Sequence, residues 1–490
     1  MNLHRSFCQL LGDIGPDSRI SASPYDTAWL ARLGDMDRTL SDGALAWLRE
    51  HQLPDGSWGA PQPRYHHERL ICTLAAMIAL ARQSCAGDRT RWQRAQSALE
   101  AATRGLLDDP AGATIGFEMI VPTLLAEAEA LGVIRGPVDG ILGKLGRYRA
   151  AKLAALPDGL VNRFFTVAFS SEMVGLDGLK LLDVENLQEA NGSVAYSPAA
   201  TTFFTLHVRP EDAAALNYLR RVAADGSAPY IAPIEVFERG WALWNLAQAG
   251  PLDDDLLALA QPHLDFLQAY WQPGEGISAC AGLTLIDGDT TGIVYDVLTR
   301  FGRAVDLEGV LHYETDDHFL CFPIEANPSI STNIHVLGAL RQAGLGVEHP
   351  TVHKVLDFLR RAQTMRMFWF DKWNASPYYS TAHAIMVCVG YADALVQDAV
   401  YWMAETQNPD GSWGYYMPTA EETAYCLQAL VAWKRQGHEV SAEALKRGAA
   451  WLAEHAEPPY PPLWIGKSLY CPEVVARSAI LSALILVAQE

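Results

Sequence analysis

Apolar residues recur three and four positions apart along most of the chain, which is the spacing of one buried face of an α-helix. Helices are expected, among other places, at residues 44–50, 69–82, 123–131, 256–270, 332–343, 352–362, 420–433 and 442–455. Short runs of Gly, Pro, Asn and Asp separate these segments, and the alternating pattern of strands is scarce. We therefore predict an all-α fold made of helix pairs, too long at 490 residues for one simple bundle.

A short motif repeats along this helical pattern. Gln-x-Pro-Asp-Gly-Ser-Trp-Gly occurs at residues 52–59 and 407–414, and a shorter copy, Gln-Glu-Ala-Asn-Gly-Ser, occurs at 188–193. Asp-Gly-Ser favours a tight turn, the glutamine suits the backbone at a neighbouring helix end, and the tryptophan covers the turn. We expect these copies to clamp successive helix pairs together, as an α/α barrel requires. Sugar binding by the tryptophans is the alternative.

Candidate chemistry is concentrated at residues 283–300. Asp287 and Asp289 lie two positions apart, and Thr290 and Thr291 follow directly, before an apolar helical run. The threonine hydroxyls are natural N-caps, so the carboxylates would lie at the positive end of the helix. Two adjacent carboxylates resist double ionisation, which favours retention of one proton. The plainer interpretation is an acidic turn that only caps a helix.

Charge and cysteine spacing exclude several classes of function. The chain has 37 Lys and Arg against 57 Asp and Glu, a net charge of −20, which disfavours binding to nucleic acid. Its eight cysteines form no Cys-x-x-Cys pair, so neither a zinc cluster nor a disulfide framework is expected. No apolar run reaches the roughly 20 residues of a membrane span, and the first residues lack a signal-peptide core. We expect a soluble, cytoplasmic protein without stable membrane insertion and leave its oligomeric state open.

Further motifs occur in a fixed order along nearly the whole chain. They are SASPYDTAWL at 21–30, HERLICTLA at 67–75, IGFE at 115–118, NGSVAYSPAAT at 191–201, FLCF at 319–322 and WIGKSLY at 464–470. Together with Asp287-Gly-Asp289, which lies where an Asp-x-Asp-Asp acid motif would be, they resemble the class II terpene cyclases of the copalyl diphosphate synthase kind. Each motif alone is weak, but their common order is specific.

The resemblance implies two α/α-barrel domains with the active site between them. A β domain would comprise residues 1–30 and 265–490 and carry the acid motif, and a γ domain at 31–264 would be inserted into it. The resemblance further implies that the substrate is a linear prenyl diphosphate. The family's ionisation-type domain and its Asp-Asp-x-x-Asp motif have no counterpart, so we expect the diphosphate to be retained.

The resemblance also implies roles for individual residues. Asp289 would be the general acid that protonates an alkene, Asp287 its partner, and Thr290, which replaces the family's third Asp, would orient the pair. Aromatic faces would stabilise the cations without quenching them. Candidates are Phe203, Trp241, Trp244, Trp369, Phe370, Tyr378 and Tyr379. For any one of them, ordinary helix packing is an equally good interpretation.

The γ domain would hold the diphosphate and Mg²⁺. Candidate ligands of Mg²⁺ are Asp108, Asp109 and Glu118, and the candidate diphosphate-binding residues are Lys152, Lys467 and Arg147. The alternatives are a solvated acidic loop and ordinary surface cations.

The terminating base and the chain length of the substrate are less constrained. In plant relatives a His and an Asn hold the water that takes the last proton; here Phe169 and Tyr230 occupy those positions. Both are bulky and should shorten the cavity, which favours farnesyl diphosphate and a drimane-type product. Geranylgeranyl diphosphate, giving a labdane- or halimane-type product, is the alternative. The base is left open among Tyr230, Glu172 and a bound water.

Three competing functions remain at this point. The first is a triterpene cyclase of the squalene–hopene type, for which the chain is short. The second is a non-catalytic α/α-barrel binding protein, which would need no proton donor. The third is an α/α-barrel glycosidase, whose two carboxylates lie about 5–10 Å apart across a sugar.

Overall fold

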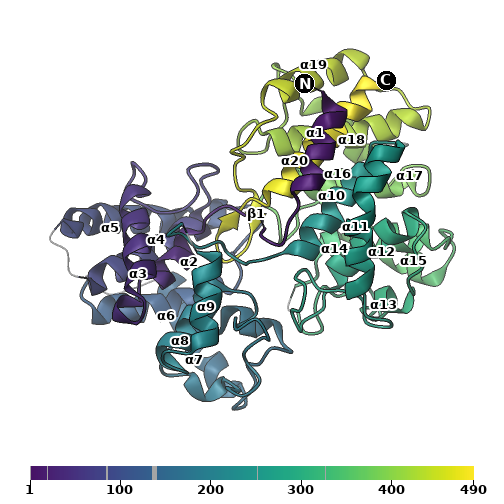
Figure 1. Ribbon diagram of the computed structural model, residues 1–490. Coiled ribbons are helices and arrows are strands. Elements are labelled where there is room, and N and C mark those ends of the chain that lie inside the picture. The colour runs from purple at the N-terminus through teal and green to yellow at the C-terminus, as the bar shows by residue number, and fades with distance from the viewer. Residues whose placement is uncertain are drawn as a thin grey trace.

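The chain folds into two helical bodies (Figure 1). The computed structural model describes residues 2–18, 20–83, 87–134, 141–223, 225–250, 252–325 and 327–490. Both termini lie on the same body, and a short hairpin lies between the two bodies.

The larger body is a barrel of two helical layers. Within the described chain, six helices contact one another in a closed inner ring: α10 (Glu235–Gln248), α12 (Gly288–Arg300), α14 (Ile330–Gln342), α16 (Pro377–Cys388), α18 (Ala420–Arg435) and α20 (Glu473–Ala488). The helices packed around them are α1 (Leu3–Asp13), α11 (Asp254–Tyr270), α13 (Glu308–Leu311), α15 (Pro350–Ala362), α17 (Asp393–Glu405) and α19 (Ala442–Glu454). Every residue of α16 is buried, whereas α15 buries only one stripe of its surface, as expected for inner and outer layers.

The smaller body repeats this plan. Its inner ring is α2 (Pro24–Leu30), α4 (His66–Arg82), α6 (Phe117–Ala130), the 3₁₀ helix η3 (Thr166–Val174) and α8 (Pro198–His207). Around it lie α3 (Arg38–Glu50), α5 (Asp88–Gly105), α7 (Ile141–Ala155) and α9 (Ala213–Val222). The remaining short elements are η1 (Gly34–Met36), η2 (Leu106–Asp108), η4 (Leu179–Leu181), β1 (Trp464–Ile465) and β2 (Leu469–Tyr470).

The β1–β2 hairpin of the larger body is bonded to the smaller body. Leu469 donates its amide to Glu68 Oε1 at 3.0 Å, and Ile115 of the smaller body donates to the carbonyl of Gly466 at 2.9 Å. The turn therefore carries residues of the WIGKSLY motif into the junction between the bodies.

The predicted all-α fold is confirmed, and each helix expected from the sequence is present. The expected domain boundaries differ from the hydrophobic packing at two places. Helix α2 packs in the core of the smaller body, because Tyr25 and Trp29 are buried there. Helices α10 and α11 pack in the core of the larger body, where Trp241 and Trp244 are buried, although residues up to 264 were assigned to the inserted domain.

The repeated motifs are structural clamps, as expected. Gln407 donates to the carbonyls of Gly411 at 2.9 Å and of Ala444, in the first turn of α19, at 2.8 Å. Trp413 Nε1 donates to the carbonyl of Met403 in α17 at 2.7 Å. The copy near the N-terminus forms the corresponding bonds to α3 and α5, and the glutamine of the shorter copy bonds to the residue that caps α9. The two full copies thus each tie one outer helix to the next, and the shorter copy ties its turn to the start of α9.

Two further findings concern the chain as a whole. Among the described residues, no helix combines the length and the apolar character needed to cross a membrane. The described cysteines are free thiols, and Cys85 lies outside the described residues.

Candidate active site

The two acidic residues lie at the first turn of α12. Asp287 is the N-cap, and its Oδ1 accepts the amide of Thr290 at 2.7 Å. The capping group is therefore this carboxylate, and not the threonine hydroxyls that we expected. Thr291 Oγ1 instead accepts the amide of Ile277 at 3.0 Å and fixes the loop before the helix. Asp289 is the second residue of the helix, so both acids lie at its positive end, as predicted.

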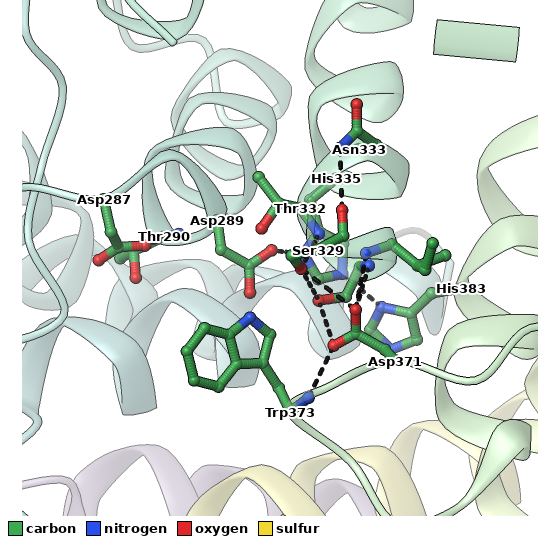
Figure 2. A network of polar contacts seen from close by, with 12 residues as sticks. Asp287, Asp289, Thr290, Ser329, Thr332, Asn333, His335, Asp371, Trp373 and His383 are labelled. Carbon is green, nitrogen blue, oxygen red and sulfur yellow. Dashed lines mark hydrogen bonds and ion pairs between the residues drawn. The ribbon is translucent and has the colours of Figure 1, made fainter. Parts of the chain in front are cut away.

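Asp289 is bonded to a histidine that the sequence did not reveal. Asp289 Oδ1 lies 2.6 Å from His335 Nδ1, and His335 Nε2 lies 2.9 Å from His383 Nδ1 (Figure 2). His335 is on α14 and His383 on α16, so neighbouring inner helices supply the three groups in order. No described side chain bonds to Asp289 Oδ2.

Close helix packing and capping fix this arrangement. A Cβ atom at Gly292 would lie 3.1 Å from the carbonyl carbon of His335, so glycine permits α14 to approach α12 closely. Asp371 accepts the amides of Ile330 and Ser331 at 2.7 and 3.1 Å and holds the start of α14 (Figure 2). The backbone therefore positions His335 before its side chain forms any bond.

Burial controls the electrostatics of the acid pair. Burial raises the pKa of Asp287 to about 7, opposed by its bond to the Thr290 amide and reinforced by the charge of Asp289. Burial also lowers the pKa of His383 well below its usual range, and a positive charge on His335 would lower it further. Asp289 is 8% exposed and has a histidine, not an arginine, as its partner. The site can therefore hold a proton away from bulk water.

Two of the predicted cation-stabilising residues meet beside His335. Trp241 Nε1 donates to the hydroxyl of Tyr379 at 3.0 Å, and the rings of Trp241 and His335 meet edge to face at 5.6 Å. Trp244 stacks at 4.4 Å on His383, the histidine that does not contact Asp289 directly. These residues enclose the histidine pair in aromatic surface.

Phe169 and Tyr230 lie at the junction and extend this aromatic surface. Five rings lie in a row, each near the next. Their centroid distances are 4.7 Å for Tyr379 to Trp464, 6.3 Å for Trp464 to Tyr470, 4.8 Å for Tyr470 to Tyr230 and 5.0 Å for Tyr230 to Phe169. We call these five residues the aromatic wall. Burial, with the charge of Asp289 as the next cause, raises the pKa of Tyr470, so this residue lies within electrostatic reach of the acid. Tyr470 was not among the candidates, although it ends a motif that was recognised.

The other four predicted pocket residues have packing contacts outside the aromatic wall. Phe203 packs against Trp29 at 5.9 Å inside the core of the smaller body. Phe370 contacts Tyr415 at 5.5 Å, and Tyr378 stacks on Trp402 of the outer helix α17 at 4.8 Å. These contacts favour the alternative of ordinary helix packing.

Trp369, the fourth of these, belongs to an unrecognised copy of the clamp. Its Nε1 donates to the carbonyl of Leu359 at 2.8 Å, and its amide donates to Thr381 Oγ1 at 3.1 Å, as Trp413 bonds to Met403 and a threonine. Gln363 precedes it by six residues, the same interval as in the other copies. This six-residue interval between glutamine and tryptophan could have identified this further clamp from the sequence.

The predicted diphosphate-binding lysines are both paired. Lys467 is fully buried, and its Nζ lies 2.7 Å from Glu172 Oε1 and 2.8 Å from Ser197 Oγ. Lys152 Nζ lies 3.6 Å from Glu118 Oε1 and is partly exposed. Arg147 is exposed on α7. Lys467 is therefore engaged with a carboxylate of the smaller body, and it is not free to receive an anion in this arrangement.

The predicted magnesium ligands do not converge. Both oxygens of Asp109 accept backbone amides, from His66 at 3.0 Å and from His67 at 2.8 Å, so this residue caps the start of α4. Asp108 is exposed, and Glu118 is paired with a lysine. In the described ranges, no three His, Cys, Asp or Glu side chains are grouped as a metal site. The trio does not fit a magnesium site in this arrangement.

A surface cavity opens at the junction of the two bodies. Its volume is ≈ 560 Å³, and its lining includes Tyr196, Arg221, Pro229 and Glu235, but not Asp289. Pro229 precedes Tyr230 of the aromatic wall in the sequence, but none of the five wall residues lines the cavity.

Known proteins resemble this chain over its whole length. Residues 324–460 match the family described as the squalene-hopene cyclase C-terminal domain. The chain is 47% identical over 494 residues to a type B diterpene cyclase of Mycobacterium tuberculosis, covering 98% of this chain and 99% of that protein. It is 32% identical over 469 residues to an ent-copalyl diphosphate synthase of a Streptomyces species, covering 90% and 87%. The structure of ent-copalyl diphosphate synthase from Streptomyces platensis superposes with a TM-score of 0.82 at 31% identity, covering 100% of both chains.

Proposed function

This chain belongs to the class II terpene cyclases, and on that premise we propose that it cyclises geranylgeranyl diphosphate to a bicyclic diphosphate. Asp289 donates the initiating proton and the diphosphate is retained. The observation that carries this proposal is the bond between buried Asp289 and His335 at one end of the aromatic wall.

The aromatic wall and the buried acid support protonation of an alkene. Protonating an unactivated alkene needs an acid shielded from water, and Asp289 is 8% exposed. Its proton adds to the less substituted carbon of the terminal alkene and leaves a tertiary cation on the other carbon. Asp289 becomes a carboxylate, whose charge the helix N-terminus and His335 offset.

Ring closure then follows along the substrate. The second double bond attacks the first cation, the third attacks the next, and loss of one proton forms the product alkene. Faces of aromatic rings attract such cations without capturing them, and the aromatic wall, with five rings in contact one after another, supports this role. The group that removes the last proton is not assigned.

The C20 substrate is supported better than the C15 substrate that we favoured from the sequence. Relatives over the whole chain are named as a diterpene cyclase and as copalyl diphosphate synthases. The farnesyl hypothesis depends on Phe169 and Tyr230, whose rings meet at 5.0 Å at the junction. Magnesium dependence remains a prediction from the resemblance to the family.

A product assay tests the proposal. The protein is incubated with geranylgeranyl or farnesyl diphosphate, with and without Mg²⁺, and the products are treated with phosphatase before chromatography. We expect a bicyclic C20 alcohol from the wild type and none from Asp289→Asn. A bicyclic C15 alcohol as the main product would restore the farnesyl hypothesis, and recovery of only linear alcohols would refute cyclisation of both substrates.

A further inference from the structure

Two histidines in series extend from the acid into the wall of the barrel. Asp289 Oδ1 lies 2.6 Å from His335 Nδ1, and His335 Nε2 lies 2.9 Å from His383 Nδ1 (Figure 2). His335 is 2% exposed and His383 is fully buried. The series ends at His383 Nε2, which has no hydrogen-bond partner among the described residues. The rings of Trp244 and Tyr379, each 4.4 Å away, lie next to it.

Each of these short contacts holds one hydrogen, and when both imidazoles are neutral this restricts the series to two arrangements. A neutral imidazole has one N–H and one lone pair. In the first arrangement, His383 donates from Nδ1 to His335 Nε2, and His335 donates from Nδ1 to Asp289. In the second, all hydrogens are reversed: Asp289 donates to His335, His335 donates to His383, and His383 Nε2 carries a buried hydrogen without an acceptor.

Only the first arrangement is compatible with the proposed reaction. Once Asp289 has given up its proton, the second arrangement would place a nitrogen lone pair 2.6 Å from a carboxylate, a repulsive contact. Before transfer, the second arrangement would direct the acidic proton at His335 and away from a substrate. It would also leave a buried donor unsatisfied, which is costly.

The surroundings of His383 suit it to be the donor. It is fully buried between aromatic rings, and no described carboxylate bonds to it, so the neutral form is favoured. The lowered pKa of His383 agrees with this. A neutral His383 has one N–H, and the nitrogen in contact with His335 is its Nδ1.

We propose that His383 is a positioning residue that donates its Nδ1 hydrogen to His335 and so fixes His335 as the Nδ1–H tautomer. His335 then bonds to Oδ1 of Asp289, and the transferable proton is held on Oδ2, the oxygen without a described partner. This inference rests on the proposed function, in which Asp289 is the acid.

A pair of variants with the same number and branching of side-chain heavy atoms tests the role of His383. In His383→Asn the amide nitrogen replaces Nδ1–H, whereas His383→Leu has the same branched shape and no donor. We expect kcat of the leucine variant to fall by about 100-fold, the scale of one acid–base contribution, with KM little changed. The asparagine variant should stay within about 3-fold of the wild type, because a conservative donor restores the bond. Equal losses in the two variants would overturn the proposal.

The tautomer of His335 is measured directly in wild-type protein labelled with ¹⁵N-histidine. Long-range ¹H–¹⁵N spectra, with the His335 signals assigned by their loss in His335→Gln, should show a protonated Nδ1 and a bare Nε2. A protonated Nε2 would refute the proposal, even if the leucine variant does not fold. The spectra need no substrate, so they separate a failure of this proposal from a failure of the wild type to form any cyclic product.

Discussion

The buried pair of Lys467 and Glu172 is expected to hold the two bodies together. Lys467 is on the hairpin of the larger body and Glu172 in η3 of the smaller body, and their contact atoms are 2.7 Å apart. Their side chains are 0% and 1% exposed, so water cannot replace a lost partner. Glu172 Oε1 also accepts the hydroxyl of Tyr25 at 2.9 Å, and Oε2 has no described partner.

Removal of one charge of the pair should therefore lower the free energy of unfolding strongly, whereas removal of both charges should change it little. In Lys467→Met the carboxylate of Glu172 stays buried with one neutral donor, which should lower the free energy of unfolding by about 4 kcal/mol. In the double variant with Glu172→Gln, no buried charge of the pair is left, and most of that loss should be recovered. Lys180→Met is the matched control, because its pair with Asp158 is more than 60% exposed and should contribute little.

Urea unfolding followed by tryptophan fluorescence measures these differences, and steady-state kinetics separates a structural role from a role in substrate binding. If Lys467 is a clamp, folded Lys467→Met binds geranylgeranyl diphosphate with nearly unchanged KM. A variant as stable as the wild type whose KM rises by about 10-fold or more, the loss of one charge-assisted contact, would refute the clamp and make Lys467 a diphosphate ligand.

Four further predictions follow from the site and the core. Asp289→Asn should reduce single-turnover cyclisation by at least about 100-fold while substrate still binds in a fluorescence titration; a smaller loss would place the acid elsewhere. Tyr230→Ala should raise the ratio of kcat/KM for geranylgeranyl over farnesyl diphosphate, and an unchanged ratio would contradict the argument that this ring limits chain length. Trp369→Phe should lower the free energy of unfolding in urea by about 1 kcal/mol, through loss of one buried bond, with no change in product; an altered product would return Trp369 to the pocket. The melting temperature should fall as pH rises from 4 to 7, because buried carboxyls with a pKa raised to about 7 bind more protons folded than unfolded; a rise would show that other groups dominate. These carboxyls are Asp26, Glu68, Asp287, Glu421 and Glu422.

The fold was predictable because its determinants are local and repeated. Apolar spacing located the helices, and the turn-forming motif located the clamps between helix pairs. The domain boundaries were not predictable from the sequence. The apolar faces of α10 and α11 would look the same in the sequence whether the core of the larger or of the smaller body buried them. Which body a helix joins depends on contacts with distant segments, such as those between α10 and α20.

The position of Asp289 at a helix start was predictable, and its histidine partners were not. Asp289 has a near neighbour of the same charge and lies at a helix start, which is a local signal. His335 and His383 are single histidines in apolar helices, and such residues are more often ordinary core residues than parts of a site. Only the closure of the inner ring, which brings α12, α14 and α16 side by side, joins them to Asp289.

In the proposed reaction, the charges around the aromatic wall would let a cation meet rings before it meets a free anion. Glu421 lies behind the wall: its Oε1 accepts Trp464 Nε1 at 2.8 Å and the hydroxyl of Tyr425 at 2.9 Å, and burial raises its pKa to about 7. At the far end, Glu172 is neutralised by Lys467, whose Nζ lies 4.5 Å from the ring of Phe169. A carboxylate in contact with the cation would end cyclisation early, by capture or by taking a proton. Protonation of Glu421 and the ion pair of Glu172 with Lys467 both lower this risk. The wall gains no net positive charge, because the charge of Lys467 is neutralised by Glu172. Asp289, whose charge acts on Tyr379 more strongly than that of Asp371, would become an anion in the proposed reaction, and the histidine series would stabilise that anion through Oδ1.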